Sequence, residues 1–213
     1  MPISDKLPKH INELSIDESV ALNISALKRD GGLARLVAVI QEAESLLEHP
    51  SPDQRPRVDQ MLAEVSHVIS PHTPCKKGCS ACCYMAAAIT THEADRISKA
   101  YDIPKAYDIP KAKVLPEYDQ ARLVKKYVAC KCPFLEHGVC QIYEQRPDAC
   151  RGFFNLSAFP ELCDVITYPG SDVPSVDLRS YWFLSSAVAA LSGEEAADIR
   201  DFFPEGLHPT QSL

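Results

Sequence analysis

The stretch of sequence that decides the fold is a run of thiols, Cys75-Lys76-Lys77-Gly78-Cys79-Ser80-Ala81-Cys82-Cys83. Its glycine and the two prolines shortly before it predict an irregular loop. A single loop can present several sulfurs to one centre without a large entropic cost of closure. Isolated cysteines often pack as small apolar residues, but four of them within nine residues favour a metal site.

The chemistry of these side chains narrows the metal to two classes. Thiolates are soft ligands that suit zinc and iron–sulfur clusters, whereas ions such as magnesium prefer oxygen. Lys76 and Lys77 place positive charge beside the thiols, which lowers thiol pKa values and favours the ligand form. The adjacent Cys82 and Cys83 are awkward ligands for one zinc ion, because neighbouring side chains leave the backbone in divergent directions.

A second group of cysteines follows further along the chain. Cys132 and Cys140 flank a Glu-His-Gly sequence at 136–138 that predicts a hairpin turn. Pro147 stands where a short helix can begin, and it places Cys150 near the first turn of that helix. A centre shielded from solvent needs ligands from both blocks, so we expect the two blocks to converge in space.

The sequence on either side of the cysteine blocks predicts helices. Residues 15–70 are expected to form three, opening on a Ser15/Glu18 capping box and interrupted at 31–32 and 50–52. Apolar residues recur at helical spacing in the second and third, which predicts a stripe that faces the domain's own core or docks a partner. Capping residues and apolar spacing predict further helices from Thr90 toward Tyr101, over 117–128 and 177–191, and from a Ser192/Glu195 capping box.

The predicted fold is mainly α: a helical protein with an irregular cysteine-rich metal-binding core and one short β-hairpin near 132–143. We expect an N-terminal helical region at 1–70, a cysteine-cluster metal-binding domain at 71–160, and C-terminal helices at 161–213 that pack on it. Residues 101–106 and 107–112 are an exact tandem copy, which we interpret as a tolerated surface duplication.

Composition and charge exclude several classes of protein. With 213 residues, 46% of them hydrophobic, the chain can bury a core. The net charge of −7 and the absence of a basic stripe argue against a nucleic-acid partner. The first fifteen residues lack the apolar centre of a signal peptide, and no apolar run approaches the roughly 20 residues that span a bilayer. We therefore expect a cytoplasmic protein without a membrane partner, whose nine cysteines are not a disulfide framework.

Together the two blocks resemble the YkgJ-type cysteine-cluster family of zinc- or iron-chelating domains, over residues 74–155. The resemblance rests on the cysteines of both blocks and on the neighbouring Cys132-Pro133-Phe134-Leu135, Ile142-Tyr143, Arg146-Pro147 and Cys150-Arg151. It implies that the metal ligands are Cys75, Cys79, Cys82, Cys83, Cys132, Cys140 and Cys150. A related segment occurs in flagellin lysine N-methylases, which look like iron–sulfur proteins.

Residues around these cysteines are expected to play lesser parts. Arg146 and Arg151 are candidates to hydrogen-bond the sulfurs or offset their charge. Cys130 and Cys163 lie outside the family pattern, so we assign them no ligand role. The nearby histidines are predicted to be solvated rather than ligands. These are His72, His92 and His137.

Two classes of function stay open at this point. The spacing Cys75-x3-Cys79-x2-Cys82 equals that of radical S-adenosylmethionine enzymes, but those begin on a barrel strand and here helices are predicted first. We expect an iron–sulfur cluster ahead of zinc, because seven cysteines exceed one tetrahedral set. The favoured role is a structural or docking module that meets a protein partner through its N-terminal helices. The alternative is an iron–sulfur enzyme in redox or S-adenosylmethionine-dependent methyl-transfer chemistry.

Overall fold

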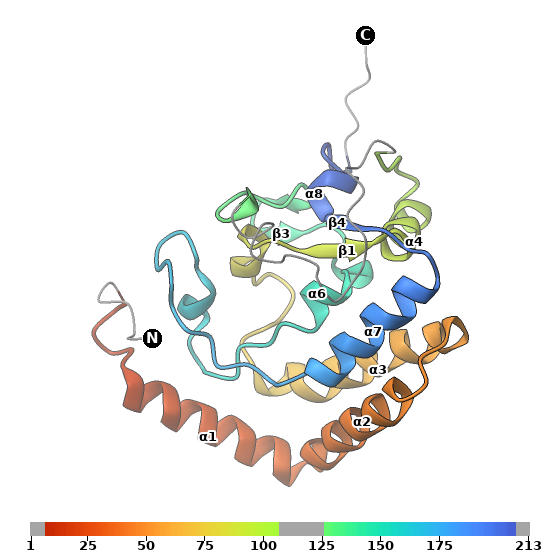
Figure 1. Ribbon diagram of the computed structural model, residues 1–213. Helices are drawn as coiled ribbons and strands as arrows, with labels where there is room; N and C mark the ends of the chain where they lie inside the picture. Colours follow the sequence, from red (N-terminus) through yellow and green to blue (C-terminus); the bar gives the residue numbers. More distant parts are fainter. Residues whose placement is uncertain (1–6, 107–125, 208–213) are drawn as a thin grey trace.

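The computed structural model describes residues 7–106 and 126–207, and its fold is mainly α, as expected. Figure 1 shows two parts, a layer of long helices and a more irregular region of short elements. The long helices are α1 (Glu13–Arg29), α2 (Gly32–Leu47), α3 (Arg55–Ile69) and α7 (Arg179–Leu191). None of the helices in the described part of the chain is long and apolar enough to cross a membrane.

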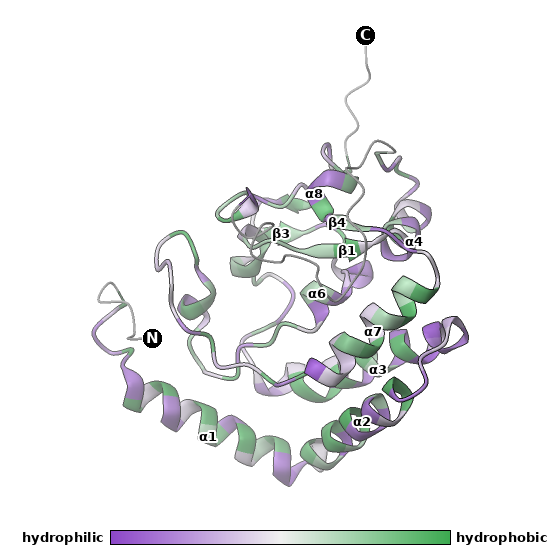
Figure 2. Ribbon diagram, in the orientation of Figure 1, coloured by the Kyte–Doolittle hydropathy of each residue, from purple (hydrophilic) through white to green (hydrophobic). Residues whose placement is uncertain are grey.

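Apolar side chains hold the long helices together. Apolar residues of α2 and α3 share one core cluster with apolar residues of α7. Figure 2 colours these helices by hydropathy and shows hydrophobic and hydrophilic residues alternating along them. Met61, Leu62, Leu184 and Val188 are fully buried in this cluster. The C-terminal helix α7 therefore packs on α2 and α3, while Ile199 and Phe202 from the last described helix share a core cluster with Cys132 and Cys150 of the cysteine region.

The three N-terminal helices and their breaks are confirmed, but the predicted capping box is wrong. Helix α1 begins three residues earlier, where the Asn12 side chain accepts a hydrogen bond from the Ser15 amide at 3.0 Å. The Ser15 hydroxyl in turn accepts one from the Asn12 amide at 2.9 Å. Glu13 and Leu14 are good helix formers, so the earlier of two overlapping capping patterns is used.

The expected hairpin and the short helix after it are also present. Strands β2 (Leu135–Glu136) and β3 (Val139–Cys140) pair antiparallel. His137 and Gly138 between them both have positive φ, 47° and 77°, as a two-residue hairpin turn requires. Helix α6 (Asp148–Arg151) starts directly after Pro147.

A second strand pair had no counterpart in the sequence analysis. Strand β1 (Ala88–Thr90) pairs antiparallel with β4 (Ala196–Asp198). At the end of β1, Thr90 and Glu93 form the capping box that opens α4 (Thr91–Tyr101). This confirms the helix predicted from Thr90 toward Tyr101. The pair brings the end of the chain back to the cysteine blocks.

The predicted Ser192/Glu195 capping box is wrong. Ser192 ends α7, and Gly193 turns the chain with a φ of 70° toward β4. The capping box in this region is instead Asp198 with Asp201, and it opens α8 (Ile199–Phe202). The second copy of the tandem repeat, 107–112, and nearly all of the helix predicted at 117–128 lie outside the described residues.

Candidate metal centre

Six thiols from both cysteine blocks surround one small cavity of about 30 Å³. This meets the expectation that the blocks converge, for all but one of the predicted ligands. The cavity is also lined by Ile142, Tyr143, Pro147 and two arginines, Arg146 and Arg200. The six cysteines are Cys79, Cys82, Cys83, Cys132, Cys140 and Cys150.

Local backbone geometry sets up each side of the cavity. Gly78 has a φ of 94°, which turns the first loop and lets the Cys79 amide donate to the Lys76 carbonyl at 2.9 Å. The short 3-10 helix at Ala81–Tyr84 then carries the adjacent Cys82 and Cys83. A hydrogen bond of 2.8 Å from the Cys132 amide to the Cys83 carbonyl joins the two blocks directly.

Cys75 is the predicted ligand that lies apart from this lining. Its sulfur accepts a hydrogen bond from the Asn155 amide at 3.4 Å. Burial, and next the neighbouring Cys75 sulfur, raise the pKa of Cys163 to about 12, so these two thiols lie near each other. Cys163 received no role from the sequence, because no local pattern connects it to a loop some ninety residues earlier.

Burial governs the charge of the thiols. It raises the pKa of Cys132 to about 11 and that of Cys150 well above its ordinary value. Cys82 is the exception: a hydrogen bond from Cys83 and the charge of Arg146 lower its pKa to about 7, although burial acts in the opposite direction. The site thus favours one thiolate by itself, and a bound cation would stabilise the others.

The two predicted arginines have different surroundings. Arg146 lines the cavity, stacks its guanidinium 3.7 Å from the centre of the Tyr143 ring, and donates to the Tyr143 carbonyl at 3.1 Å. Its position suits the expected role of offsetting sulfur charge. Arg151 instead forms an ion pair of 2.7 Å with Asp148 and does not line the cavity, so its expected role beside the sulfurs stays a prediction.

The donor set fits a thiolate-bound metal in its chemistry. Within residues 7–106 and 126–207, no three cysteine, histidine or acidic side chains are drawn together tightly enough to hold an ion as they stand. A cysteine sulfur changes position by rotation about a single bond, so side-chain rotation can bring these sulfurs closer together. The histidines are engaged elsewhere, His72 with Asp30 at 3.4 Å and His92 with Asp59 at 3.2 Å.

Helix α6 separates the cysteine cavity from a second, larger one of about 360 Å³. Glu93, Asp148, Ala149 and Trp182 contribute to the wall of the larger cavity, while Cys150 lines the smaller one. Glu93 accepts from the Asp148 amide at 2.7 Å, and burial together with the Asp148 charge raises the pKa of Glu93 to about 7. Nothing in the sequence marks this cavity, since its walls come from five separate segments: 88–93, 148–153, 175–176, 182–189 and 196.

Residues 74–164 match the family model CxxCxxCC, described as "Putative zinc- or iron-chelating domain". Over this segment the chain is similar to that family of domains. The match confirms the suspected family and extends beyond the expected residue 155 to include Cys163. No curated protein matches the chain, and no solved structure does. The match and the clustered cysteines around one cavity together support metal binding by this segment.

Proposed function

We propose that the CxxCxxCC domain of this protein holds an iron–sulfur cluster and serves as a structural or docking module of a larger assembly. The observation that carries the proposal is the set of six thiols from two sequence blocks around one cavity. Six sulfurs exceed the four of one tetrahedral zinc site. Arg146 and Arg200 beside them supply the positive charge that a negatively charged cluster needs.

Zinc is the second candidate for the metal, and the size of the cavity favours it. About 30 Å³ accommodates an ion more readily than a cluster unless the surrounding loop widens. Two zinc ions that share thiolates would also use six sulfurs. The two metals differ in what they supply: zinc fixes the fold, whereas a cluster also carries electrons.

Anaerobic purification followed by metal and acid-labile sulfide analysis tests the proposal. Iron and sulfide in near-equal amounts, with visible charge-transfer absorption, are expected. Cys79→Ser and Cys150→Ser should abolish both, while Cys130→Ser, at an exposed thiol outside the cavity lining, should leave them unchanged. Stoichiometric zinc without sulfide rejects the cluster, and a chain that binds neither metal rejects the module.

Cys163→Ser tests the ligand set separately. Our sequence-based prediction is that this variant retains its metal. The proximity of Cys163 to Cys75 makes it the most informative thiol outside the predicted seven. Loss of metal in Cys163→Ser but not in Cys130→Ser would show that the ligand set includes residues that the sequence pattern left out.

The larger cavity favours an enzyme as the second candidate function. Its 360 Å³ falls in the usual range of small-molecule sites, and it adjoins the metal centre across α6. S-adenosylmethionine, the cofactor of the alternative function expected from the sequence, is the ligand proposed for this cavity. Calorimetric titration of the metal-loaded protein with S-adenosylmethionine should show saturable binding that Ser186→Phe, which fills the cavity, removes. An absence of binding to the unaltered protein discards this candidate.

A further inference from the structure

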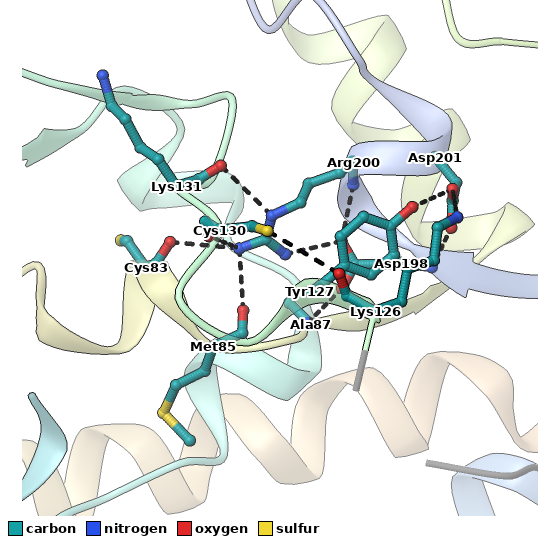
Figure 3. A network of polar contacts seen from close by, with 10 residues as sticks. All are labelled: Cys83, Met85, Ala87, Lys126, Tyr127, Cys130, Lys131, Asp198, Arg200 and Asp201. Atoms are coloured by element: carbon teal, nitrogen blue, oxygen red, sulfur yellow. Dashed lines mark hydrogen bonds and ion pairs between the residues drawn. The ribbon is translucent and has the colours of Figure 1, made fainter. Parts of the chain in front are cut away.

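The guanidinium of Arg200 reaches carbonyl groups of both cysteine blocks (Figure 3). From the first block it donates to Met85 at 3.0 Å and to Cys83 at 3.4 Å. From the approach to the second block it donates to Cys130 at 2.6 Å and to Lys131 at 3.3 Å. One side chain therefore bridges the two segments that supply most of the thiols.

These carbonyls lie directly beside predicted ligands. The Cys83 carbonyl belongs to a cavity cysteine and also accepts from the Cys132 amide at 2.8 Å. Lys131 immediately precedes Cys132, so fixing its carbonyl fixes the direction in which the Cys132 side chain leaves the backbone. A guanidinium has five donors in a rigid plane, which allows one residue to orient several carbonyls at once, and a lysine lacks this geometry.

Asp198 anchors the guanidinium from the other side. Its carboxylate is fully buried, pairs with Arg200 at 2.7 Å, and accepts from the Ala87 amide at 2.7 Å. Both residues belong to the β4–α8 segment, which lies beyond the matched residues 74–164. A second ion pair links the same segment to the residues before Cys130: Lys126 pairs with Asp201 of α8 at 2.8 Å.

We propose that Arg200 is a positioning residue of the metal centre, which holds the two cysteine blocks in register so that their sulfurs can bind one metal group. This proposal rests on the proposed metal-binding function. Arg200 acts through the backbone of Cys83, Cys130 and Lys131, and its own role is geometric. Arg200 also lines the cavity, where burial raises the pKa of Cys132 and the charge of Arg200 acts in the opposite direction.

The test compares Arg200→Lys and Arg200→Met with Arg179→Met, a matched control at an exposed arginine paired with Asp177. Arg200→Lys keeps a positive charge that can pair with Asp198 and loses only the planar set of guanidinium N–H donors. It is therefore the variant expected to fold. The expected result is transfer of metal to a colorimetric chelator about 10- to 100-fold faster in the Arg200 variants. The visible metal–thiolate band, of the isolated cluster or of cobalt loaded in place of zinc, should also shift.

A metal-independent measurement separates this proposal from the function on which it rests. In the metal-free protein, amide hydrogen exchange over 83–85 and 130–132 should be faster in the Arg200 variants than in Arg179→Met. If the unaltered protein holds no metal, the proposed function fails, and the exchange measurement still decides the role of Arg200. Equal exchange rates, or metal release and spectra in Arg200→Lys equal to those of Arg179→Met, overturn the proposal.

A separate observation concerns the outer face of α1. Leu14 and Leu22 are 67% and 70% exposed there, and the small residues Ala21 and Ser25 on the same face are also exposed. Glu18, Ala21, Leu22 and Ser25 line a shallow hollow on this face. The opposite face of the helix packs on the protein through Ile16 and Leu27, so the outer face lacks an intramolecular partner among the described residues.

The charges along α1 point to its partner. Acidic residues occupy the first half of the helix, and Lys28 and Arg29 occupy its last turn. An antiparallel second copy of α1 would place each acidic half against a basic end, with the small residues at the crossing point. The acidic residues are Glu13, Asp17 and Glu18.

We infer that the outer face of α1 pairs antiparallel with the same face of a second copy of this chain. A helix of 17 residues is about 25 Å long, so the contact is smaller than a standard interface and predicts a weak dimer. Such a pairing gives the N-terminal helices the docking role proposed above.

Sedimentation equilibrium over a range of concentrations tests the pairing. Leu22→Glu should abolish the dimer, while Phe183→Glu, at an exposed apolar residue on α7, should not. A triple variant with lysine at 13, 17 and 18, and a double variant with glutamate at 28 and 29, should each be monomeric alone and dimerise when mixed. A monomeric unaltered protein at every concentration, or no recovery in the mixture, overturns the inference.

Discussion

The long helices and the cysteine region are held together by different forces. Apolar contacts join α2, α3 and α7 over a continuous core that includes Met61, Leu62 and Leu184. The cysteine region has an apolar floor too, around Phe134 and Phe202, but its segments are tied by buried polar groups. Its regular elements are also short, with α4 the longest at 11 residues.

This difference indicates which of the two regions keeps its structure without a bound metal. Apolar burial is non-directional and tolerates small shifts, so the helices stay associated without a ligand. Ion pairs and hydrogen bonds in the interior contribute only when their geometry is satisfied. The cysteine region therefore depends on the groups that fix its geometry, namely its metal, Asp198 with Arg200, and Glu93 with Asp148.

Removal of the metal should produce the largest difference in stability between the two regions. Structural zinc in small domains contributes about 10–16 kcal/mol of binding free energy, and that energy is lost on chelation. Amide hydrogen exchange should then become fast over 75–87 and 130–152 and stay slow in α2, α3 and α7. Equal loss of protection in both regions would show that they unfold as one unit.

Loss of the Asp198 carboxylate should be the next largest effect. Asp198→Ala leaves the charge of Arg200 without its buried partner, and breaking a buried ion pair lowers the free energy of unfolding by about 3–5 kcal/mol. Chemical denaturation followed by circular dichroism measures this. Asp177→Ala, at an exposed carboxylate, is the control and should leave the midpoint unchanged. Similar midpoints for the two variants would remove Asp198 from the set of groups on which the region depends.

A cavity in the helical core should weaken the other region. Leu62→Ala removes a fully buried side chain and should lower the free energy of unfolding by about 2–5 kcal/mol. The metal content of the folded variant should be unchanged, since Leu62 contacts the helical core and not the cysteine cavity. A metal content that falls in step with stability would contradict the separation of the two regions.

The smallest expected effect comes from the cap of α4. The Thr90 hydroxyl accepts from the Glu93 amide at 3.3 Å, and loss of an N-cap lowers the free energy of unfolding by about 1 kcal/mol. Thr90→Ala should show this in the same denaturation measurement, whereas Thr90→Ser, which keeps the hydroxyl, should lie close to the unaltered protein. A larger decrease in the free energy of unfolding for Thr90→Ala than for Asp198→Ala would contradict the greater importance of the buried ion pair.

Features encoded by neighbouring residues were predictable from the sequence. The Thr90/Glu93 cap, the hairpin at 136–138 and the helix after Pro147 each depend on a few adjacent positions. The convergence of the cysteines followed from the chemistry of thiolates. The capping box of α1 was misplaced because two such patterns overlap near Ser15, and the helix-forming residues Glu13 and Leu14, which favour the earlier one, were not weighed.

Features made by distant segments were not predictable. Strands β1 and β4 have three residues each, too few for an alternation of apolar and polar residues to be recognisable. Arg200 binds backbone carbonyls, which every residue has, so nothing in the sequence of its partners marks it. Cys75 was grouped with the other ligands by spacing, although tertiary packing places it next to Asn155.

The pairing of β1 with β4 also sets an order of events during synthesis. It places Ala88 opposite Asp198, more than a hundred positions later in the chain. Contacts over such separations form late in folding. At about 5–20 residues per second, a ribosome needs roughly 3 to 10 s between Cys150 and Arg200. During this interval all the thiols of the cavity have been made and the residues that hold them in register have not. A metal delivered to the nascent chain in this interval would meet the thiols before Ile199 and Arg200 exist, whereas one delivered to the finished protein meets a cavity that these two residues already line.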